Sequence, residues 1–319
     1  MEEEKRTGNA KEEKHAVLFE KADSSAMDGE AFHAEKRVEI AKKAGFCYGV
    51  RRALDLTVQA ADGTDGPVYT LGELIHNEQV IAGLRERGIH AVASPEELAR
   101  LPVGTVIIRS HGVSRAVYEA LAATGHTILD GTCPHVKRIH RIAAEYSAKG
   151  YRMLIIGRAS HPEVLGIAGW CSGRAPWIVE TAEEANMLPV LPGEPVCIVE
   201  QTTFQEIIFK ELVEIISEKG YHTKVCSTIC TATLERQDAA RALAENADAM
   251  IVIGGRKSSN TRKLYEICSG ICPNTYFIQT KEDLAQTNFC RFNYVGITAG
   301  ASTPNKIIEE VQNSVRKKF

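Results

Sequence analysis

Short apolar runs alternate with segments of helical periodicity through most of the chain. The first helix is indicated by Val50, Ala53, Leu54 and Val58, which recur at helical spacing after the turn at 45–49. The apolar runs that predict strands are 68–71, 103–108, 128–129, 153–156, 196–199, 224–226, 249–253 and 294–297. Because each run leads through a polar or glycine-bearing turn into a helical pattern, the chain is predicted to be α/β, with parallel sheets and right-handed connections.

Chemically unusual residues fall in the loops just past the predicted strands. In parallel α/β folds such loops share one edge of a sheet, where ligands bind, so residues far apart in the sequence converge. The residues placed there are Cys47, His76, His111, Cys133, His161, Glu163, Thr202, Cys230, Ser258, Asn260 and Ser302. The pattern predicts one site that combines thiols, imidazoles, hydroxyls and a carboxyl group.

Composition and charge narrow the class of protein. The chain has 319 residues, 44% hydrophobic and 25% charged, with a net charge of -3, which is typical of a globular protein with two or three domains. Its scattered Lys and Arg residues give no footprint for nucleic acid. Residues 1–36 predict a solvated extension without the apolar core of a secretory signal. Since no apolar run reaches membrane-spanning length, we expect a cytoplasmic protein.

Nine cysteines in a chain without a secretory signal predict reduced thiols, some with a metal or catalytic role. Cys47, Cys133 and Cys230 stand at nearly equal intervals, which suggests three similar domains that each present one thiol. Cys47 precedes a helix, where backbone amides favour the thiolate. Three separated thiolates suit an iron-sulfur cluster with one open iron better than zinc, whose ligands normally come in close pairs. Scattered packing cysteines are the alternative.

Two C-x3-C pairs offer a rival metal site. Cys226 with Cys230, and Cys268 with Cys272, could hold zinc or a cluster in the last third of the chain. Against this, Cys226 falls within a predicted strand, and the second pair lies around a helix end, where packing is the usual role. The cysteines without a partner in the pattern are Cys171, Cys197 and Cys290.

Imidazoles and hydroxyls in these loops suggest a diphosphate site, because both donate to phosphate oxygens and helix starts favour anions. The residues concerned are His76, His111, His161, Ser258, Ser259, Asn260 and Ser302. The run Gly-Gly-Arg-Lys-Ser-Ser lacks P-loop spacing, which excludes a P-loop nucleotide hydrolase. Glu163 adds a carboxyl group that could deliver a proton if burial raises its pKa. The alternative is a surface glutamate in the first turn of a helix.

The ordered motifs resemble one family, the 4-hydroxy-3-methylbut-2-enyl diphosphate reductases. The resemblance runs from about Val38 to the C-terminus and leaves the N-terminal extension outside the family pattern. The motifs are Gly45-Phe46-Cys47-x-Gly-Val-x-Arg-Ala, Ile75-His76-Asn77, Ser110-His111-Gly112-Val113, Asp130-x-Thr132-Cys133-Pro134, His161-Pro162-Glu163-Val164, Gln201-Thr202-Thr203, Ile229-Cys230-x-Ala232-Thr233 with Arg236-Gln237, Ser258-Ser259-Asn260 and Thr298-Ala299-Gly300-Ala301-Ser302.

The resemblance implies a role for each site residue. Cys47, Cys133 and Cys230 would bind a 4Fe-4S cluster at the centre of three α/β lobes arranged as a pseudo-threefold trefoil, which sets Cys226 aside. The open iron would bind the substrate hydroxyl, and Glu163 would supply a proton. The residues implied to position the reacting end are Thr202 and His161. Those implied to hold the diphosphate are His76, His111, Ser258, Ser259, Asn260 and Ser302.

The implied reaction removes the hydroxyl group of (E)-4-hydroxy-3-methylbut-2-enyl diphosphate reductively, giving isopentenyl and dimethylallyl diphosphate, with ferredoxin or flavodoxin as electron donor. This is the last step of the non-mevalonate isoprenoid pathway. The expected lobes are 37–133, 134–228 and 229–302, with 303–319 packing back on the first.

Two other functions fit part of the pattern. One is a cluster enzyme of the quinolinate synthase type, against which the loops with Ser258, Asn260 and Ser302 argue. The other is a cluster-bearing redox sensor, in which Glu163 would be idle.

Overall fold

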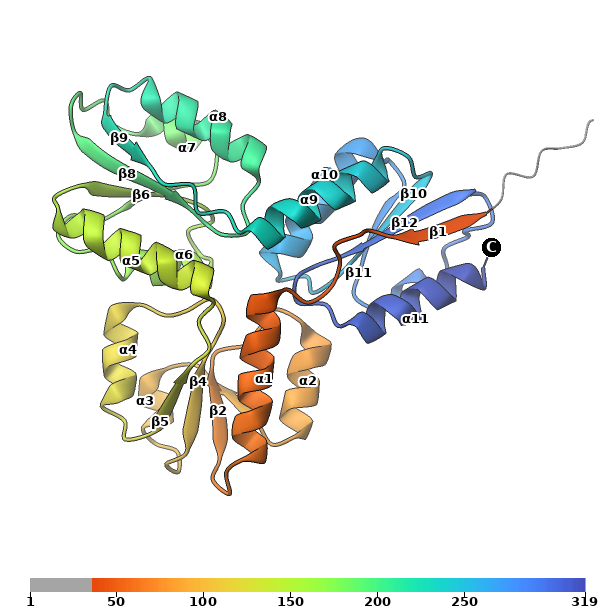
Figure 1. Cartoon of the computed structure of the whole chain (residues 1–319), viewed down its shortest axis with the longest axis horizontal. Helices are drawn as coiled ribbons and strands as arrows, with labels where there is room; N and C mark the ends of the chain where they lie inside the picture. Colours follow the sequence, from red (N-terminus) through yellow and green to blue (C-terminus); the bar gives the residue numbers. More distant parts are fainter. Residues whose placement is uncertain (1–35, 319) are drawn as a thin grey trace, which may run out of the picture. The chain divides into compact units, whose positions relative to one another are not determined.

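The computed structural model describes residues 36–318, which belong to one compact unit of the chain. These residues form three four-stranded sheets, and every pair of neighbouring strands is parallel (Figure 1). Each sheet with its helices makes one lobe, which confirms the predicted α/β class with three lobes. Apart from Lys36, the predicted N-terminal extension lies outside the described residues.

The three sheets repeat one strand order. In the first lobe the order is β3 (His90–Val92), β2 (Val68–Leu71), β4 (Thr105–Ile108) and β5 (Thr127–Asp130). In the second lobe it is β7 (Trp177–Val179), β6 (Arg152–Ile156), β8 (Pro195–Glu200) and β9 (His222–Val225). In the third lobe it is β11 (Thr275–Ile278), β10 (Ala249–Ile253), β12 (Tyr294–Ala299) and β1 (Arg37–Ile40).

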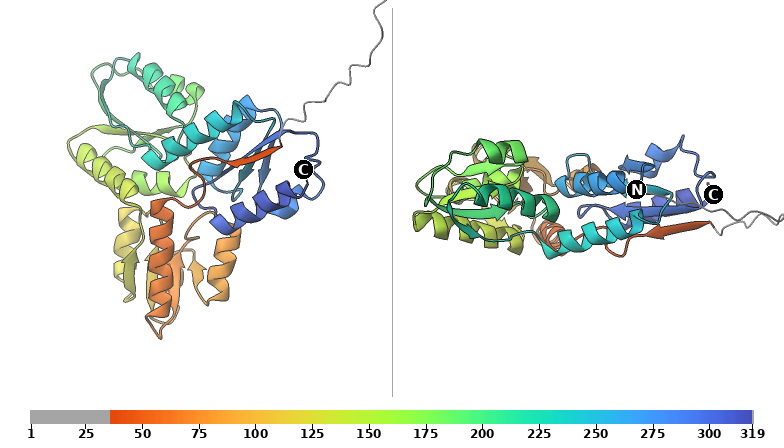
Figure 2. Two further views of the ribbon diagram at one scale, coloured as in Figure 1. Left: turned by 45° about the vertical axis from the view of Figure 1, so that its right-hand side comes forward. Right: turned by 90° about the horizontal axis from the view of Figure 1, so that it is seen from above.

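Helices connect the parallel strands and carry the apolar faces that cover the sheets (Figures 1 and 2). They are α1 (Tyr48–Asp62), α2 (Glu78–Glu86), α3 (Pro95–Leu98), α4 (Arg115–Ala122), α5 (Pro134–Ala148), α6 (Pro162–Ala168), α7 (Ala182–Met187), α8 (Glu206–Ser217), α9 (Thr231–Ala244), α10 (Ser259–Ile271), the 3-10 helix η1 (Lys281–Leu284) and α11 (Asn305–Arg316). No helix among residues 36–318 is both long and apolar enough to cross a membrane.

Each of the three edge strands β1, β5 and β9 leads into a helix that packs on the next lobe. Helix α1 follows β1, but its Val50 and Ala53 lie in the core of the first lobe. Helix α5 follows β5 and packs on the second lobe, and α9 follows β9 and packs on the third. The cysteines Cys47, Cys133 and Cys230 stand at these three passages, each between a strand of one lobe and a helix of the next.

Two boundaries differ from those expected. Residues 37–40 were expected in the first lobe, but β1 pairs with β12 and belongs to the third sheet. Residues 303–319 were expected to pack on the first lobe, but α11 buries Ile308, Val311 and Val315 in the core of the third. The reason is local: α11 follows β12 directly, so the connection returns its apolar face to the sheet that contains β12.

The short outer strands β3, β7 and β11 were missing from the sequence prediction. Their burial patterns leave two residues of β3 exposed and most residues of β7 and β11 half-buried. Such strands show little apolar periodicity, because each pairs with only one neighbouring strand and is only partly covered by other elements. They complete the sheets on the side away from the edge strands that precede the cysteines.

Candidate active site

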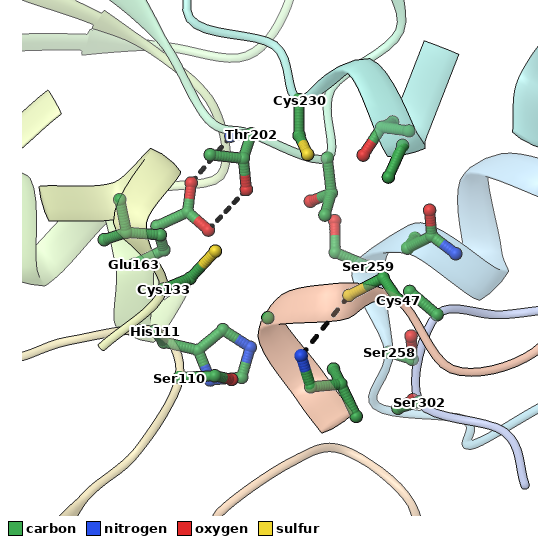
Figure 3. A pocket seen from close by; sticks show the side chains of 18 of the residues that line it. Cys47, Ser110, His111, Cys133, Glu163, Thr202, Cys230, Ser258, Ser259 and Ser302 are labelled. Carbon is green, nitrogen blue, oxygen red and sulfur yellow. Dashed lines mark hydrogen bonds between the residues drawn. The ribbon is translucent and has the colours of Figure 1, made fainter. Parts of the chain in front are cut away.

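All the predicted site residues line one pocket, to which each of the three lobes contributes (Figure 3). Equivalent strands supply them. The edge strands β1, β5 and β9 precede the cysteines, while the strands beside them, β12, β4 and β8, precede Ser302, His111 and Thr202. The third strands in order, β10, β2 and β6, precede the serine cluster, His76, and the His161-Glu163 pair. The predicted convergence of loops at the ends of parallel strands is therefore present.

The three cysteines are the N-cap residues of α1, α5 and α9. Their sulfur atoms face the same space in Figure 3, and Cys47 Sγ accepts a hydrogen bond from Val50 N at 3.4 Å. Pro134, directly after Cys133, occupies the first helical turn, where its missing N–H costs nothing. Three helix N-termini thus point at one centre, and their unpaired amides favour negative charge there.

The backbone holds each cysteine to the loop of the neighbouring strand. Cys47 N donates to Ala301 O at 3.1 Å, Cys133 N to Ser110 O at 3.0 Å, and Cys230 N to Thr202 O at 3.1 Å. Each acceptor is a predicted site residue or stands next to one, namely Ser302, His111 or Thr202 itself. The thiols and the polar side chains of the pocket are therefore positioned by the same three backbone contacts.

Close packing around the thiols explains two glycines in the first motif. A Cβ atom added at Gly49 would lie 2.6 Å from Cys133 Sγ, so only glycine lets the start of α1 approach that thiol. Gly45 has φ of +81°, a conformation that favours glycine, and its carbonyl accepts from Arg236 Nη2 at 2.6 Å. The buried Arg236 also donates to Ala232 O at 2.7 Å, which ties the start of α9 to the loop before Cys47.

Burial opposes ionisation of the free thiols. It raises the pKa of Cys133 to about 11, although the backbone amide of His135 favours the thiolate, and neighbouring Cys47 and Cys230 raise the pKa further. Burial also raises the pKa of Cys230. The helix N-termini therefore do not by themselves make these two residues thiolates. A metal that binds here must displace protons, and its positive charge supplies the missing stabilisation.

The rival cysteine pairs do not form a second site. Cys268 and Cys272 are buried in the apolar core of the third lobe. Cys226 lies just past β9, where it interacts with Cys197 and packs in the second lobe. Among the described cysteines, only Cys47, Cys133 and Cys230 line the pocket.

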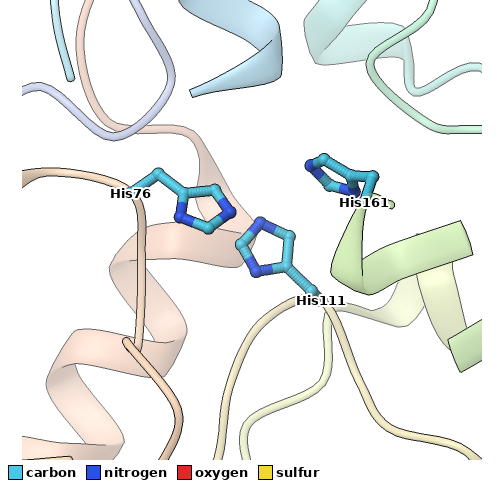
Figure 4. Close-up of side chains that lie close together, drawn as sticks. All are labelled: His76, His111 and His161. Atoms are coloured by element: carbon cyan, nitrogen blue, oxygen red, sulfur yellow. The ribbon is translucent and has the colours of Figure 1, made fainter. Parts of the chain in front are cut away.

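Three histidines form a compact group on one wall of the pocket (Figure 4). The rings of His76 and His111 stack with centroids 4.6 Å apart, and His161 meets His111 edge-on at 5.3 Å. Burial lowers the pKa of all three, to about 3 for His161 and well below the usual value for His111. The Nδ1 atoms of His76 and His111 are buried without a hydrogen-bond partner.

This histidine group can bind either an anion or a metal ion. Its ligand atoms lie within 4.8 Å of one another, as in a three-histidine metal site. The charges nearby are mixed but favour an anion. The Glu73 carboxylate lies 3.7 Å from His76 Nδ1, but it is paired with Lys257 Nζ at 2.9 Å. Arg109, to which the sequence assigned no role, is close enough to lower the pKa of each of the three histidines. A fixed positive charge attracts an anion and repels a metal cation.

Polar groups of the third lobe face the histidines across the pocket. Ser258 caps α10 by accepting from Thr261 N at 3.3 Å, and Ser302 Oγ donates to His76 O at 3.0 Å. Asn260 is 4% exposed, and neither its Nδ2 nor its Oδ1 has a partner. Leaving a buried amide unpaired is costly, so a ligand or water must complete it. With the N-terminus of α10, these groups can bind an oxyanion.

Glu163 is buried at the start of α6, which excludes the surface alternative, since only 2% of the residue is exposed. Thr202 N donates to one carboxyl oxygen at 2.6 Å, and Thr202 Oγ1 donates to the other at 2.8 Å (Figure 3). Burial raises the pKa of Glu163 to about 7, although both hydrogen bonds favour the carboxylate. The group can therefore hold and release a proton near neutral pH.

A second buried carboxyl group, Glu200, was not predicted. Its Oε1 accepts from Ser227 Oγ, Thr228 N and Ile229 N, each at 3.0 Å, which fixes the loop before Cys230. Glu200 does not line the pocket. The sequence could indicate only that Glu200 is near the site, because it directly precedes Gln201 and Thr202. The loop that it holds is visible only in the folded structure.

Comparison with known proteins gives a consistent result. A family model described as LytB protein matches residues 38–316. The 4-hydroxy-3-methylbut-2-enyl diphosphate reductase of Thermoanaerobacter sp. (strain X514) is 45% identical over 282 residues, covering 88% of this chain and 96% of that relative. The enzyme of the same name from Aquifex aeolicus (strain VF5) is 42% identical over 282 residues, covering 87% and 95%.

Two solved structures share the fold. One, (E)-4-hydroxy-3-methyl-but-2-enyl diphosphate reductase, described as the terminal enzyme of the non-mevalonate pathway, has a TM-score of 0.64 and 40% identity, covering 88% of this chain and 99% of that one. The reductase from Plasmodium falciparum has a TM-score of 0.81 and 26% identity, covering 89% and 88%. From the match over residues 38–316 and the identity to these relatives, the chain belongs to the LytB family of 4-hydroxy-3-methylbut-2-enyl diphosphate reductases.

Proposed function

We propose that the enzyme reductively removes the hydroxyl group of (E)-4-hydroxy-3-methylbut-2-enyl diphosphate to give isopentenyl and dimethylallyl diphosphate. The observation that carries the proposal is the single pocket in which three N-cap cysteines face a buried, proton-holding Glu163. The reaction consumes two electrons and two protons, and it releases water. It therefore needs a redox centre, a proton donor and a diphosphate site together.

Cys47, Cys133 and Cys230 would hold a 4Fe-4S cluster. The residues fit such a group, because three thiols face one space and no other described cysteine lines the pocket. When bound, the cluster would supply electrons singly and, at the iron without a cysteine, a Lewis acid for the substrate hydroxyl. The three helix N-termini would stabilise its negative charge.

Glu163 would protonate the departing oxygen, since hydroxide is a poor leaving group. Its position is set by Thr202, whose amide and hydroxyl both hold the carboxyl group and whose carbonyl accepts from Cys230 N. The proton donor and one cluster ligand thus share a single positioning residue. The second proton goes to carbon, and the substrate diphosphate is a chemically reasonable source for it.

The diphosphate would bind between the histidine group and the third lobe. His76 and His111 offer unpartnered ring nitrogens, while Ser258, Asn260 and Ser302 approach from the other side. Ser259 lines the same wall, where its Oγ accepts from Gln201 Nε2 at 3.1 Å. His161, as the N-cap of α6, accepts from Glu163 N at 3.2 Å and would help place the reacting end.

An anaerobic turnover assay tests the function. The full chain is reconstituted with iron and sulfide, supplied with reduced methyl viologen, and mixed with the hydroxylated diphosphate. We expect viologen oxidation with formation of both five-carbon diphosphates. Protein that holds about four irons but does not oxidise viologen would contradict the proposal. Uptake of one Zn²⁺ by the histidines, without turnover, would favour the metal-site alternative.

The pH profile gives a second prediction. Because the pKa of Glu163 is about 7, its proton is present below pH 7 and is lost as pH rises through 7, so turnover should fall on the alkaline side. Thr202→Val removes one hydrogen bond that favours the carboxylate. The pKa should then rise, and the midpoint of the alkaline limb should move to higher pH.

Thr203→Val is the matched control for the pH profile. The Thr203 hydroxyl accepts from Gln201 Nε2 at 2.8 Å and does not touch Glu163, so the midpoint should stay unchanged. An equal shift in both variants, or a shift toward lower pH in Thr202→Val, would contradict Glu163 as the titrating group.

A further inference from the structure

The three helices that begin at the cysteines are equivalent in the fold but differ in surface charge. We compare the positions three, four and seven residues after the first residue of each helix, which lie along one stripe of the helix surface. On α1 this stripe carries Arg51, Arg52 and Asp55, and on α5 it carries Lys137, Arg138 and Arg141. On α9 the same positions hold Leu234, Glu235 and Asp238. At these three positions, the helices after Cys47 and Cys133 carry arginine or lysine, whereas the helix after Cys230 carries none.

The stripes of α1 and α5 are joined into one patch. Arg52 Nη1 donates to Thr132 O at 3.3 Å and Nη2 to Asp130 O at 3.2 Å, while Lys137 Nζ pairs with Asp130 at 2.6 Å. Asp130 thus lies between the two helices and is neutralised by Lys137. We call the surface formed by Arg51, Arg52, Lys137, Arg138 and Arg141 the basic patch.

The basic patch lies on the two helices that begin at Cys47 and Cys133, two of the proposed cluster ligands. Tyr48, the first residue of α1 and the neighbour of Cys47, is 70% exposed, and Pro134 beside Cys133 is exposed as well. Helices α1 and α5 both lie on the near side of the molecule in Figure 1, and the view from above in Figure 2 places them along one edge. The proposed substrate side chains do not belong to this surface, since they line the pocket and none of the five patch residues does.

We propose that the basic patch is the docking surface for the electron donor, a small protein with an acidic surface around its redox group. The inference rests on the proposed function, which requires two electrons to enter singly. Electron transfer falls steeply with distance, so the donor must approach the cluster where the covering protein is thinnest. Tyr48 and Pro134, the exposed first residues of α1 and α5, stand directly next to Cys47 and Cys133, so the chain reaches the surface one residue away from each of these ligands.

The charge distribution favours an acidic protein over a nucleic acid. The whole chain is acidic, with a net charge of -3, and the equivalent stripe on α9 is acidic. The basic patch is therefore local, which suits the small, short-lived contacts of electron-transfer complexes. Complementary charges in such a contact increase the association rate more than the final affinity.

The test uses the reconstituted full-chain enzyme and a reduced acidic flavodoxin, mixed anaerobically in a stopped-flow instrument. Arg51→Glu with Arg138→Glu reverses one exposed charge on each helix. We expect the second-order rate constant for enzyme reduction to fall about 10-fold or more at low ionic strength. The difference should shrink in about 1 M salt, where charges are screened within about 3 Å. Reduction by dithionite, which needs no docking, should be unchanged.

Arg100→Glu with Arg316→Glu is the matched control, because both arginines are exposed and lie outside the basic patch. This pair should reduce at the normal rate. Equal flavodoxin rates in the patch variant and the control would overturn the docking surface. The docking surface would also be overturned if the patch variant is reduced at the normal rate but changes its oligomeric state in a sedimentation experiment, because the patch would then be a contact between copies of the chain. If instead the wild-type enzyme fails with viologen as well, the proposed function fails, and the two failures are distinguishable.

Discussion

A Glu163→Gln enzyme is expected to turn over about 10²-fold or more slowly than the wild type while it still folds, retains iron and binds the diphosphate. The fold should survive because glutamine has the same shape. Its Oε1 can accept from Thr202 N, and the Thr202 hydroxyl can turn to accept from Nε2, so both contacts to Thr202 are preserved. What is lost is the proton, which the amide cannot supply.

Glu200→Gln is the matched control for this loss of a carboxyl group. Glu200 is also buried, and burial raises its pKa too, but it lies outside the pocket. Its Oε2 has no partner, while Oε1 accepts from the loop before Cys230, and the glutamine carbonyl can take over that role. Turnover should remain near the wild-type rate. Single-turnover kinetics with viologen measure both variants, and near-normal turnover of Glu163→Gln would remove this residue from the mechanism.

The second large effect concerns two cysteines four positions apart. Cys230→Ser should lose the cluster, whereas Cys226→Ser should keep it. Serine is a favoured N-cap residue, so α9 should still form in the first variant. Cys226 instead contacts Cys197 beside the second lobe's core, away from the pocket. Both variants replace a thiol by a hydroxyl group, so they differ only in where the replaced side chain lies: Cys230 lines the pocket and Cys226 does not.

Iron and sulfide content after anaerobic reconstitution, together with the visible absorption spectrum, measures this difference. Circular dichroism confirms that both variants are folded. We expect about four irons per chain in Cys226→Ser and a loss of the cluster absorption in Cys230→Ser. Loss of the cluster in both variants would restore the C-x3-C pairs as the metal site. Retention of the cluster in Cys230→Ser would contradict the assignment of Cys230 as a ligand.

Much of the fold follows from local patterns. Central strands such as 249–253 are fully buried on both faces, so they appear in the sequence as continuous apolar runs. Outer strands such as β7 do not, because part of each residue faces water. The lobe of β1 could not be predicted either. Its partner β12 is more than two hundred residues away, and no local property of 37–40 records that pairing.

The candidate site divides in the same way. Cysteines at strand-to-helix turns and hydroxyls at helix starts are local features, so the order of residues alone singles out Cys133 and Ser258. Arg236 could not be given a role, because its partner Gly45 O lies 191 residues away in the sequence. The roles of Glu200 and Arg109 could not be predicted either. Glu200 holds the loop before Cys230 and Arg109 lies near the three histidines, and folding brings these segments together.

The sequence by itself determined the alternation of the inner strands with helices and the chemical groups in the loops between them, because side-chain periodicity and turn residues act over a few positions. Only the tertiary structure decided which sheet receives β1 and α11, which cysteines share a space, and that Glu163 carries a pKa of about 7. The physical reason is common to all three. Pairing, packing and desolvation depend on atoms contributed by distant segments, and a buried carboxyl group has no local signature that distinguishes it from an exposed one.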